Sequence, residues 1–258
     1  MAHLPADFEA LLRKLERRKL KRLEKDAETY KIMAGVFDYS TLMTLYRMVH
    51  RGIFDELYGA VSTGKEANIF SALDKQGNYV AVKVYRIATS DFKTMYRYLV
   101  GDPRFRTFRR ERRSIIYTWV SREFKNLRRA REAGVSAPEP IDRENNVLAM
   151  EFIGERGLPY PRMKDSPPKN PRAVFEELLD EVEALYSNGK LIHADLSEYN
   201  VLVRPEPVLI DFSMATDIKN PMSDELLLRD LSNLVNYFRK LKVKVPEPIE
   251  LFTKIKGE

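Results

Sequence analysis

Three side chains whose oxygen atoms can bind a metal, Asp195, Asn200 and Asp211, lie close together in the sequence. The apolar runs 201–203 and 208–210 flank a proline-rich turn, which predicts a β-hairpin. Such a hairpin pairs Asn200 with Asp211 and brings their Cβ atoms to about 5 Å. These oxygens suit Mg²⁺, and Asp195 on the preceding loop is placed to hold a substrate hydroxyl beside the metal. Taken singly, each residue is more typical of a turn or a helix cap than of a metal site, so the interpretation depends on their spacing.

A lysine inside a predicted strand is the next candidate for chemistry. Residues 58–61, 67–73 and 79–85 have the composition of three β-strands, and Lys83 lies in the third. Lysine is rare in a buried strand, so its side chain either reaches solvent on the far face or projects into a cleft toward an anion. The loop 62–67 between the first two strands is a candidate to cover a phosphate with backbone amides, although it contains a single glycine.

Helices are predicted in four parts of the chain, where apolar residues recur at helical spacing. The first part is a helical region over about the first 50 residues, which includes a helix with Ser40 as the expected N-cap. The other three predicted helices are 114–132, 170–189 and a helix that begins after Ser223. Glu123 falls in the second of these four and is either a surface residue or, if that helix packs behind the sheet, the partner of Lys83.

Two stretches divide these elements. A predicted strand, 147–152, leads into a proline-rich connection that is the natural hinge between two lobes. Residues 87–113 show no clear period, and we expect a mobile or substrate-responsive segment there. We expect a small C-terminal lobe, because 47 residues follow Asp211 in this sequence.

The amino-acid composition limits the classes of protein to which this chain can belong. The 258 residues carry 44 Lys and Arg against 38 Asp and Glu, a net charge of +6 that favours polyanionic partners. The basic blocks 13–25 and 104–113 either hold phosphates or RNA or form solvated helix faces. The absence of Cys excludes disulfide scaffolds, thiolate metal sites and Cys nucleophiles. With no signal peptide and no run of about 20 apolar residues, we expect a cytoplasmic protein without membrane partners.

These residues resemble the protein-kinase superfamily, and specifically the RIO-type atypical serine/threonine kinases. Residues 193–200 are similar to the kinase catalytic loop, and 211–213 to the Asp-Phe-Gly metal motif. Ala81-Val82-Lys83 resembles the strand motif whose lysine engages the α- and β-phosphates of ATP. The resemblance covers roughly residues 56–240.

Departures from ordinary protein kinases narrow the family. The phosphate loop reads Ser-Thr-Gly-Lys-Glu-Ala over 62–67, Ser213 replaces the glycine of the metal motif, and no Ala-Pro-Glu motif follows Asp211. The first RIO subfamily, in its archaeal form, is the closest fit. This resemblance implies an α+β, two-lobed protein-kinase-like fold. Its expected parts are an N-terminal helical extension over 1–52, a β-rich N-lobe over 53–153 and a small helical C-lobe over 154–258.

The resemblance also implies a role for each site residue. Asp195 is expected to be catalytic, and Asn200 and Asp211 to hold Mg²⁺. The expected ATP-binding residues are Ser62, Lys65, Lys83, Met150, Glu151 and Ile153. Glu123 is expected to support Lys83.

The implied function is an ATP-dependent serine/threonine kinase that uses Mg²⁺, or Mn²⁺ as a substitute, and phosphorylates proteins including itself. The family further implies ATPase activity during maturation of the small ribosomal subunit, with a pre-ribosomal particle or ribosomal RNA as partner. Two alternatives stay open. One is a nucleotide-switched module that binds RNA or the pre-ribosome, and the other is a small-molecule phosphotransferase of the aminoglycoside-kinase type.

Overall fold

The computed structural model describes residues 37–88, 91–105, 108–204 and 206–257. The predicted helical region over 1–52 therefore lies mostly outside the described residues. The chain divides into two compact units. Unit 1 is the chain up to Ser90 together with Ile141–Phe152, and unit 2 is Asp91–Pro140 together with Ile153–Glu258. The expected domain boundaries after residues 52 and 153 stay a prediction.

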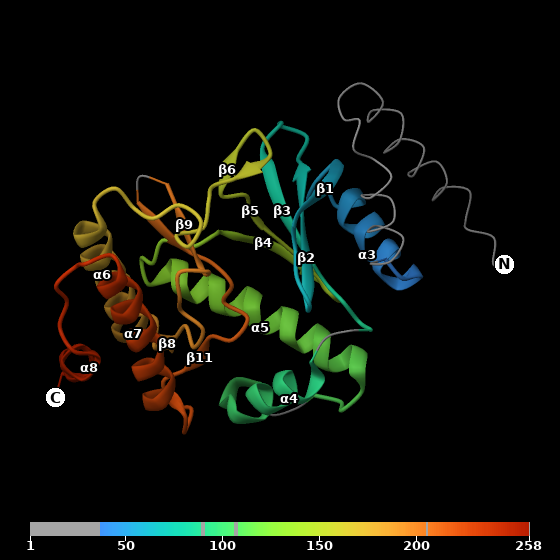
Figure 1. Ribbon diagram of the computed structural model, residues 1–258. Coiled ribbons are helices and arrows are strands. Elements are labelled where there is room, and N and C mark those ends of the chain that lie inside the picture. Colours follow the sequence, from blue (N-terminus) through green and yellow to red (C-terminus); the bar gives the residue numbers. More distant parts are fainter. Residues whose placement is uncertain (1–36, 89–90, 106–107, 205, 258) are drawn as a thin grey trace. The chain divides into compact units, whose positions relative to one another are not determined.

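Unit 1 is built on a five-stranded sheet with the order β1-β2-β3-β5-β4, shown in Figure 1. Neighbouring strands from β1 to β5 in that order pair in antiparallel fashion. The elements of this unit are α3 (Tyr39–His50), β1 (Glu56–Thr63), β2 (Ala67–Leu73), β3 (Tyr79–Tyr85), β4 (Pro140–Glu144) and β5 (Val147–Glu151). The four strands predicted in this region are confirmed, whereas β4 was missed.

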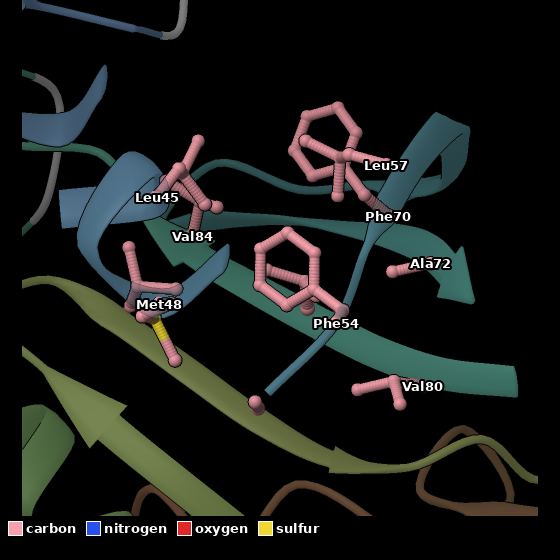
Figure 2. Close-up of a cluster of buried hydrophobic side chains, with 11 residues drawn as sticks. Leu45, Met48, Phe54, Leu57, Phe70, Ala72, Val80 and Val84 are labelled. Carbon is pink, nitrogen blue, oxygen red and sulfur yellow. The ribbon is translucent and has the colours of Figure 1, made fainter. Parts of the chain in front are cut away.

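The core of unit 1 lies on one face of this sheet. Because side chains alternate along a strand, Val80, Val82 and Val84 of β3 point into the core while Lys83 points to the opposite face. Figure 2 shows Val80 and Val84 with Leu45 and Met48 of α3 in this buried cluster. The sheet therefore has one face that packs in this apolar core and an opposite face that carries Lys83.

The N-cap of α3 lies two residues earlier than the sequence suggested. The N-cap is Asp38, whose carboxylate accepts a hydrogen bond from the Thr41 backbone N–H at 2.8 Å, so the expected cap Ser40 was wrong. The negative charge of a carboxylate at this position also interacts favourably with the helix dipole. Ser40 lies inside the helix, where its carbonyl accepts from the Thr44 hydroxyl at 2.9 Å.

Unit 2 contains the remaining elements. Its helices are α4 (Phe92–Gly101), the 3-10 helix η1 (Pro103–Phe105), α5 (Arg112–Glu132), α6 (Pro171–Ser187), α7 (Ser223–Lys240) and α8 (Pro248–Lys256). Its short strands are β6 (Gly154–Glu155), β7 (Leu158–Pro159), β8 (Leu191–Ile192), β9 (Val201–Val203), β10 (Pro207–Leu209) and β11 (Thr216–Asp217). The helices α6, α7 and α8 pack on one another (Figure 1), and the strands form the pairs β6–β7, β8–β11 and β9–β10.

The segment 87–113 is more regular than the sequence suggested, because α4 occupies its centre. Asp91 caps this helix by accepting hydrogen bonds from the backbone N–H groups of Lys93 and Thr94, each at 3.1 Å. Met95 and Leu99, four residues apart, are buried on one side of α4. The helix is short, and its polar and aromatic neighbours hid this period in the sequence.

Candidate active site

The hairpin that follows the catalytic loop forms with a register one residue away from the prediction. Val201 lies opposite Leu209, and the Ile210 N–H donates to the Asn200 carbonyl at 2.9 Å. Asn200 therefore lies opposite Ile210, and its predicted pairing with Asp211 was wrong. The prediction assigned Pro207 to the turn. In the structure β10 begins at Pro207, which pairs with Val203, because proline is tolerated as the first residue of a strand. Asp211 directly follows the residue that pairs with Asn200.

Asp195 and Asn200 are joined by two hydrogen bonds. The Asn200 side-chain N–H₂ group donates to the Asp195 carbonyl at 2.8 Å and to its carboxylate at 3.0 Å. These bonds use the amide nitrogen and fix the orientation of the Asn200 side chain, whose amide oxygen is then the atom suited to a metal.

The electrostatics of this loop favour a cation. Burial by the surrounding protein, followed by repulsion from Asp211, raises the pKa of Asp195 above its ordinary value. Two carboxylates that repel each other, with an amide oxygen beside them, form a hard donor set suited to Mg²⁺. Within the described part of the chain no three His, Cys, Asp or Glu side chains form a metal cluster. Mg²⁺ usually binds to proteins through one or two carboxylates together with the phosphates of a substrate.

Helix α7 holds the backbone of the catalytic loop through Asp230. This buried carboxylate accepts hydrogen bonds from the Ala194 N–H at 2.7 Å and the Leu196 N–H at 2.9 Å, on either side of Asp195. Asn233, one turn later, donates to the Leu196 carbonyl at 3.0 Å. Ala194 has a φ of 64°, a left-handed conformation that a non-glycine residue keeps only when its surroundings hold it. The two N–H bonds to Asp230 provide that support.

Sequence reasoning did not assign this anchoring role, although a signal was present. Asp230 occupies a position on the apolar face of α7, between Leu227 and Leu231, where a charged residue requires partners. Burial raises the pKa of Asp230 to about 7, against the effect of the two N–H bonds. The partners themselves lie more than 30 residues away in the chain and were not predictable from local pattern.

His193 ties the start of the catalytic loop to the end of the hairpin. Its Nε2–H donates to the Ile210 carbonyl at 3.0 Å, and its ring packs on that of Phe212 with centroids 4.8 Å apart. Burial lowers the pKa of His193 to about 4, so the ring is neutral at pH 7. A neutral ring that donates from Nε2 fits this single carbonyl partner.

Helix α5 fixes the segment after Asp211 with three side chains on one face, Arg122, Asn126 and Arg129. The Asn126 amide donates to the carbonyls of Phe212 at 3.0 Å and Ala215 at 2.7 Å. Arg122 donates to the Ser213 carbonyl at 2.8 Å and the Met214 carbonyl at 3.2 Å. Arg129 pairs with Asp217 at 2.8 Å. Sequence reasoning missed all three, although Arg122 and Asn126 share the buried side of α5 with Trp119.

The predicted phosphate-binding residues of unit 1 share one face of its sheet. Ile69 of β2 pairs with Ser62 of β1 on one side and with Lys83 of β3 on the other. Because residues that pair across strands point to the same face, the Ser62 and Lys83 side chains project from one face of the sheet. Met150 lies opposite Ala81, two residues before Lys83, and belongs to this face too. Lys83 is only 5% exposed, which excludes the solvent-facing alternative. Its amine lies 5.1 Å from the centre of the Tyr85 ring.

The remaining predicted residues occupy separate places. Lys65 is exposed in the loop between β1 and β2, which is closed by the Gly64 N–H donating to the Ala67 carbonyl at 2.9 Å. Glu151 is the last residue of β5, Ile153 is buried in unit 2, and Glu123 is buried on α5. The pairing of Glu123 with Lys83 stays a prediction, because these residues belong to different units. The adenine-binding roles also stay predictions.

Comparison with known proteins gives the family. The RIO domain family matches residues 68–251. The RIO-type serine/threonine-protein kinase Rio1 of Methanocaldococcus jannaschii is 44% identical over 90% of this chain and 79% of that protein. The protein of the same name from Haloferax volcanii is 41% identical over 84% of this chain and 74% of that protein. The chain therefore belongs to the RIO-type serine/threonine-protein kinase family, and the sequence-based recognition is confirmed.

A solved structure confirms the expected kinase-like fold. The Rio2 kinase of Chaetomium thermophilum, in its complex with ADP, Mg²⁺ and phosphoaspartate, superposes with a TM-score of 0.64 at 19% identity. The match covers 97% of this chain and 86% of that one. Among the described residues, no helix has the length and apolar character of a membrane span.

Proposed function

We propose that this protein is an ATP- and Mg²⁺-dependent serine/threonine kinase that phosphorylates protein hydroxyls, including its own. Its relatives named as serine/threonine-protein kinases support this assignment. They also favour it over the small-molecule phosphotransferase alternative. The observation that carries the proposal is the pair of hydrogen bonds from Asn200 to Asp195 in a loop that α7 holds on both sides.

In this proposal Asp195 orients the attacking hydroxyl and accepts its proton. A raised pKa brings this carboxylate closer to the range in which a general base works efficiently at neutral pH. The Asn200 amide oxygen and the Asp211 carboxylate are the Mg²⁺ ligands. The metal, when bound, neutralises charge on the β- and γ-phosphates.

The residues of unit 1 supply the phosphate contacts. Lys83 clamps the phosphates, Ser62 on the same sheet face donates its hydroxyl, and Lys65 closes over them from the loop. Glu123 supports Lys83. Met150 borders the adenine, and backbone groups of Glu151 and Ile153 bind its edge. Most of the rate enhancement in such a transfer comes from positioning and charge neutralisation, which these groups are suited to provide.

A second candidate function is a nucleotide-switched module that binds RNA or a pre-ribosomal particle during maturation of the small ribosomal subunit. Here ATP hydrolysis controls affinity for RNA, and phosphoryl transfer to protein is incidental. The observation that favours this role is the basic block 104–113, where Arg109, Arg110, Arg112 and Arg113 are exposed. Exposed arginines in such density are suited to phosphates of a polyanion.

One experiment separates the two functions. The purified full chain is incubated with ATP labelled at the γ-phosphate, with Mg²⁺ or Mn²⁺, and with or without single-stranded RNA. Label on serine or threonine of the protein supports the kinase. Release of free phosphate that RNA stimulates supports the switch. The absence of both products would overturn both functions.

A further inference from the structure

A polar cavity of about 560 Å³ lies in unit 2, and none of its lining residues belongs to the candidate active site. It is lined by residues of η1, by Arg109 and Glu111, and by residues of α5, the long helix beside α4 in Figure 1. Its lining residues are Arg104, Phe105, Arg109, Glu111, Arg113, Ser114, Tyr117, Thr118, Ser121 and Lys125. A cavity of this volume has room for one nucleotide-sized group.

The charge of the lining is strongly positive. Counting only residues that the structure describes, the lining contains four cations, Arg104, Arg109, Arg113 and Lys125, and a single carboxylate, Glu111, while Arg104 also pairs with Asp102 outside the lining. Arginine in particular presents several N–H donors in a plane and binds phosphate through two of them at once. The cavity is therefore suited to an anion with several oxygen acceptors.

The uncharged lining adds hydrogen-bonding groups and rings. Ser114, Thr118 and Ser121 recur at helical spacing on one face of α5, and all three line the cavity. The Thr118 hydroxyl donates to the Ser114 carbonyl at 2.7 Å, so its oxygen can accept a hydrogen bond. Tyr117 and Phe105 supply aromatic rings, and the Lys125 amine lies 5.1 Å from the centre of the Phe105 ring.

We propose that this cavity binds one nucleotide of a single-stranded RNA, with the phosphate among Arg104, Arg109, Arg113 and Lys125 and the base against Tyr117. Single-stranded nucleic acids are held in this way, by a cationic path along the backbone and by stacking of bases on aromatic rings. The inference deepens the RNA-binding part of the proposed function and rests on that part alone.

The surface next to the cavity favours a polymer over an isolated phosphorylated molecule. Arg110 lies over the Tyr96 ring at 5.4 Å, and Arg112 lies over the Phe92 ring at 4.1 Å. Tyr96 also contacts Phe108, with centroids 5.8 Å apart. Paired cations and rings outside the cavity suit the neighbouring phosphates and bases of a strand, whereas a small metabolite would need only the cavity.

A chain of ion pairs joins this cavity to the segment after Asp211. Arg104, in the lining, pairs with the buried Asp102 at 2.6 Å, and Asp102 pairs with the buried Arg122 at 3.2 Å. Arg122 in turn donates to the Ser213 and Met214 carbonyls. A phosphate that attracts Arg104 competes with Asp102 for it and so changes the interactions of Arg122.

The test measures binding of a fluorescent single-stranded RNA decamer to the full chain by anisotropy, without ATP, over a series of salt concentrations. The cavity variant is Arg109→Glu/Lys125→Glu. The matched control is Arg128→Glu/Arg172→Glu, which makes the same change in charge at two exposed arginines outside the lining. Tyr117→Ala is measured as a third variant. Thermal unfolding of each variant verifies that it is folded.

The proposal expects the cavity variant to bind at least tenfold more weakly than wild type. Loss of two phosphate contacts should reduce the slope of log affinity against log salt by about 1.4. Loss of stacking in Tyr117→Ala should weaken binding by about fivefold or more. The control should stay within twofold of wild type.

Two results would overturn the proposal. If the cavity variant and the control weaken RNA binding equally, RNA affinity depends only on net charge. Tighter binding of a mononucleotide or a phosphoserine peptide than of the decamer would assign the cavity to a different ligand. Because no ATP is present, this binding result can be interpreted even if the kinase assignment fails.

Discussion

Asp195 is the residue on which the proposed chemistry depends. Asp195→Asn keeps the size of the side chain but removes the group that accepts the proton of the attacking hydroxyl. We expect phosphoryl transfer to fall by about 10²- to 10⁴-fold, the usual contribution of a general base. Initial rates with labelled ATP measure this effect, and an unchanged melting temperature shows that the loop is intact. A variant that keeps wild-type rates would remove Asp195 from its catalytic role.

His193 makes stability depend on pH. Burial lowers its pKa to about 4, so below about 6.5 the unfolded chain binds a proton that the folded chain does not. Its contribution to the free energy of unfolding is fully present above pH 6.5 and is lost as pH falls toward 4, by about 3 kcal/mol in total. The pKa of Asp230 is raised to about 7, so its contribution to the free energy of unfolding increases as pH falls over this range, opposite to that of His193.

A variant separates these two contributions. His193→Asn removes the imidazole but leaves Asp230 in place, so the difference in unfolding free energy between wild type and variant isolates the histidine. We expect that difference to shrink by about 3 kcal/mol between pH 7 and pH 4. Urea unfolding at several pH values measures it. A difference that is constant with pH would contradict the buried, neutral state of His193.

At the scale of elements, two helices hold the two functional loops. Asp230 of α7 binds the backbone on both sides of Asp195, and Arg122 and Asn126 of α5 bind the carbonyls that follow Asp211. Short loops with strained residues need such support, because their own backbone hydrogen bonds are few. The helices therefore act as rigid frames for side chains that the loops present.

Arg122 tests this view of α5. The buried ion pair with Asp102 holds two charges away from water, and burial lowers the pKa of Arg122 to about 10, which still leaves it protonated. Arg122→Met leaves Asp102 with Arg104 alone and leaves two carbonyls without their donor. We expect a loss of about 3 kcal/mol in stability, as found when one partner of a buried pair is removed. Urea unfolding measures it.

A second readout distinguishes an effect on the loop from a general loss of stability. If Arg122 positions the segment after Asp211, the Mg²⁺ concentration for half-maximal activity should rise in Arg122→Met at a temperature where the variant is fully folded. Arg129→Met, which breaks the more exposed pair with Asp217, is the matched control and should change this concentration less. An unchanged requirement in both variants would make Arg122 a purely structural residue.

At the scale of the molecule, the strongly periodic elements were predictable. The composition of residues 79–85 correctly predicted β3 with Lys83 inside it, and the signal of Asn170 followed by Pro171 correctly located the start of α6. Elements with weak or short periods, β4, α4 and α8, were missed. The hairpin was placed one residue out of register because Pro207 joins a strand.

The parts of the site that sequence could not supply are those made by distant partners. The motif residues Asp195, Asn200 and Asp211 were recognisable because their spacing is local. Arg122 and Asp230 reach their loops across 91 and 36 residues of chain, respectively. No local pattern predicts such contacts, although a buried charge on an apolar helix face signals that a partner exists.

The central claim is that Asp211 and Asn200 bind the Mg²⁺ that phosphoryl transfer requires. The most direct test compares turnover of labelled ATP by wild type and Asp211→Ala, each with Mg²⁺ and with a chelator. Asn188→Ala, at the end of α6 and outside the site, serves as the control. We predict that wild type and the control turn over ATP only when Mg²⁺ is present, and that Asp211→Ala does not turn it over in either condition. Retained Mg²⁺-dependent turnover in Asp211→Ala would contradict the metal assignment.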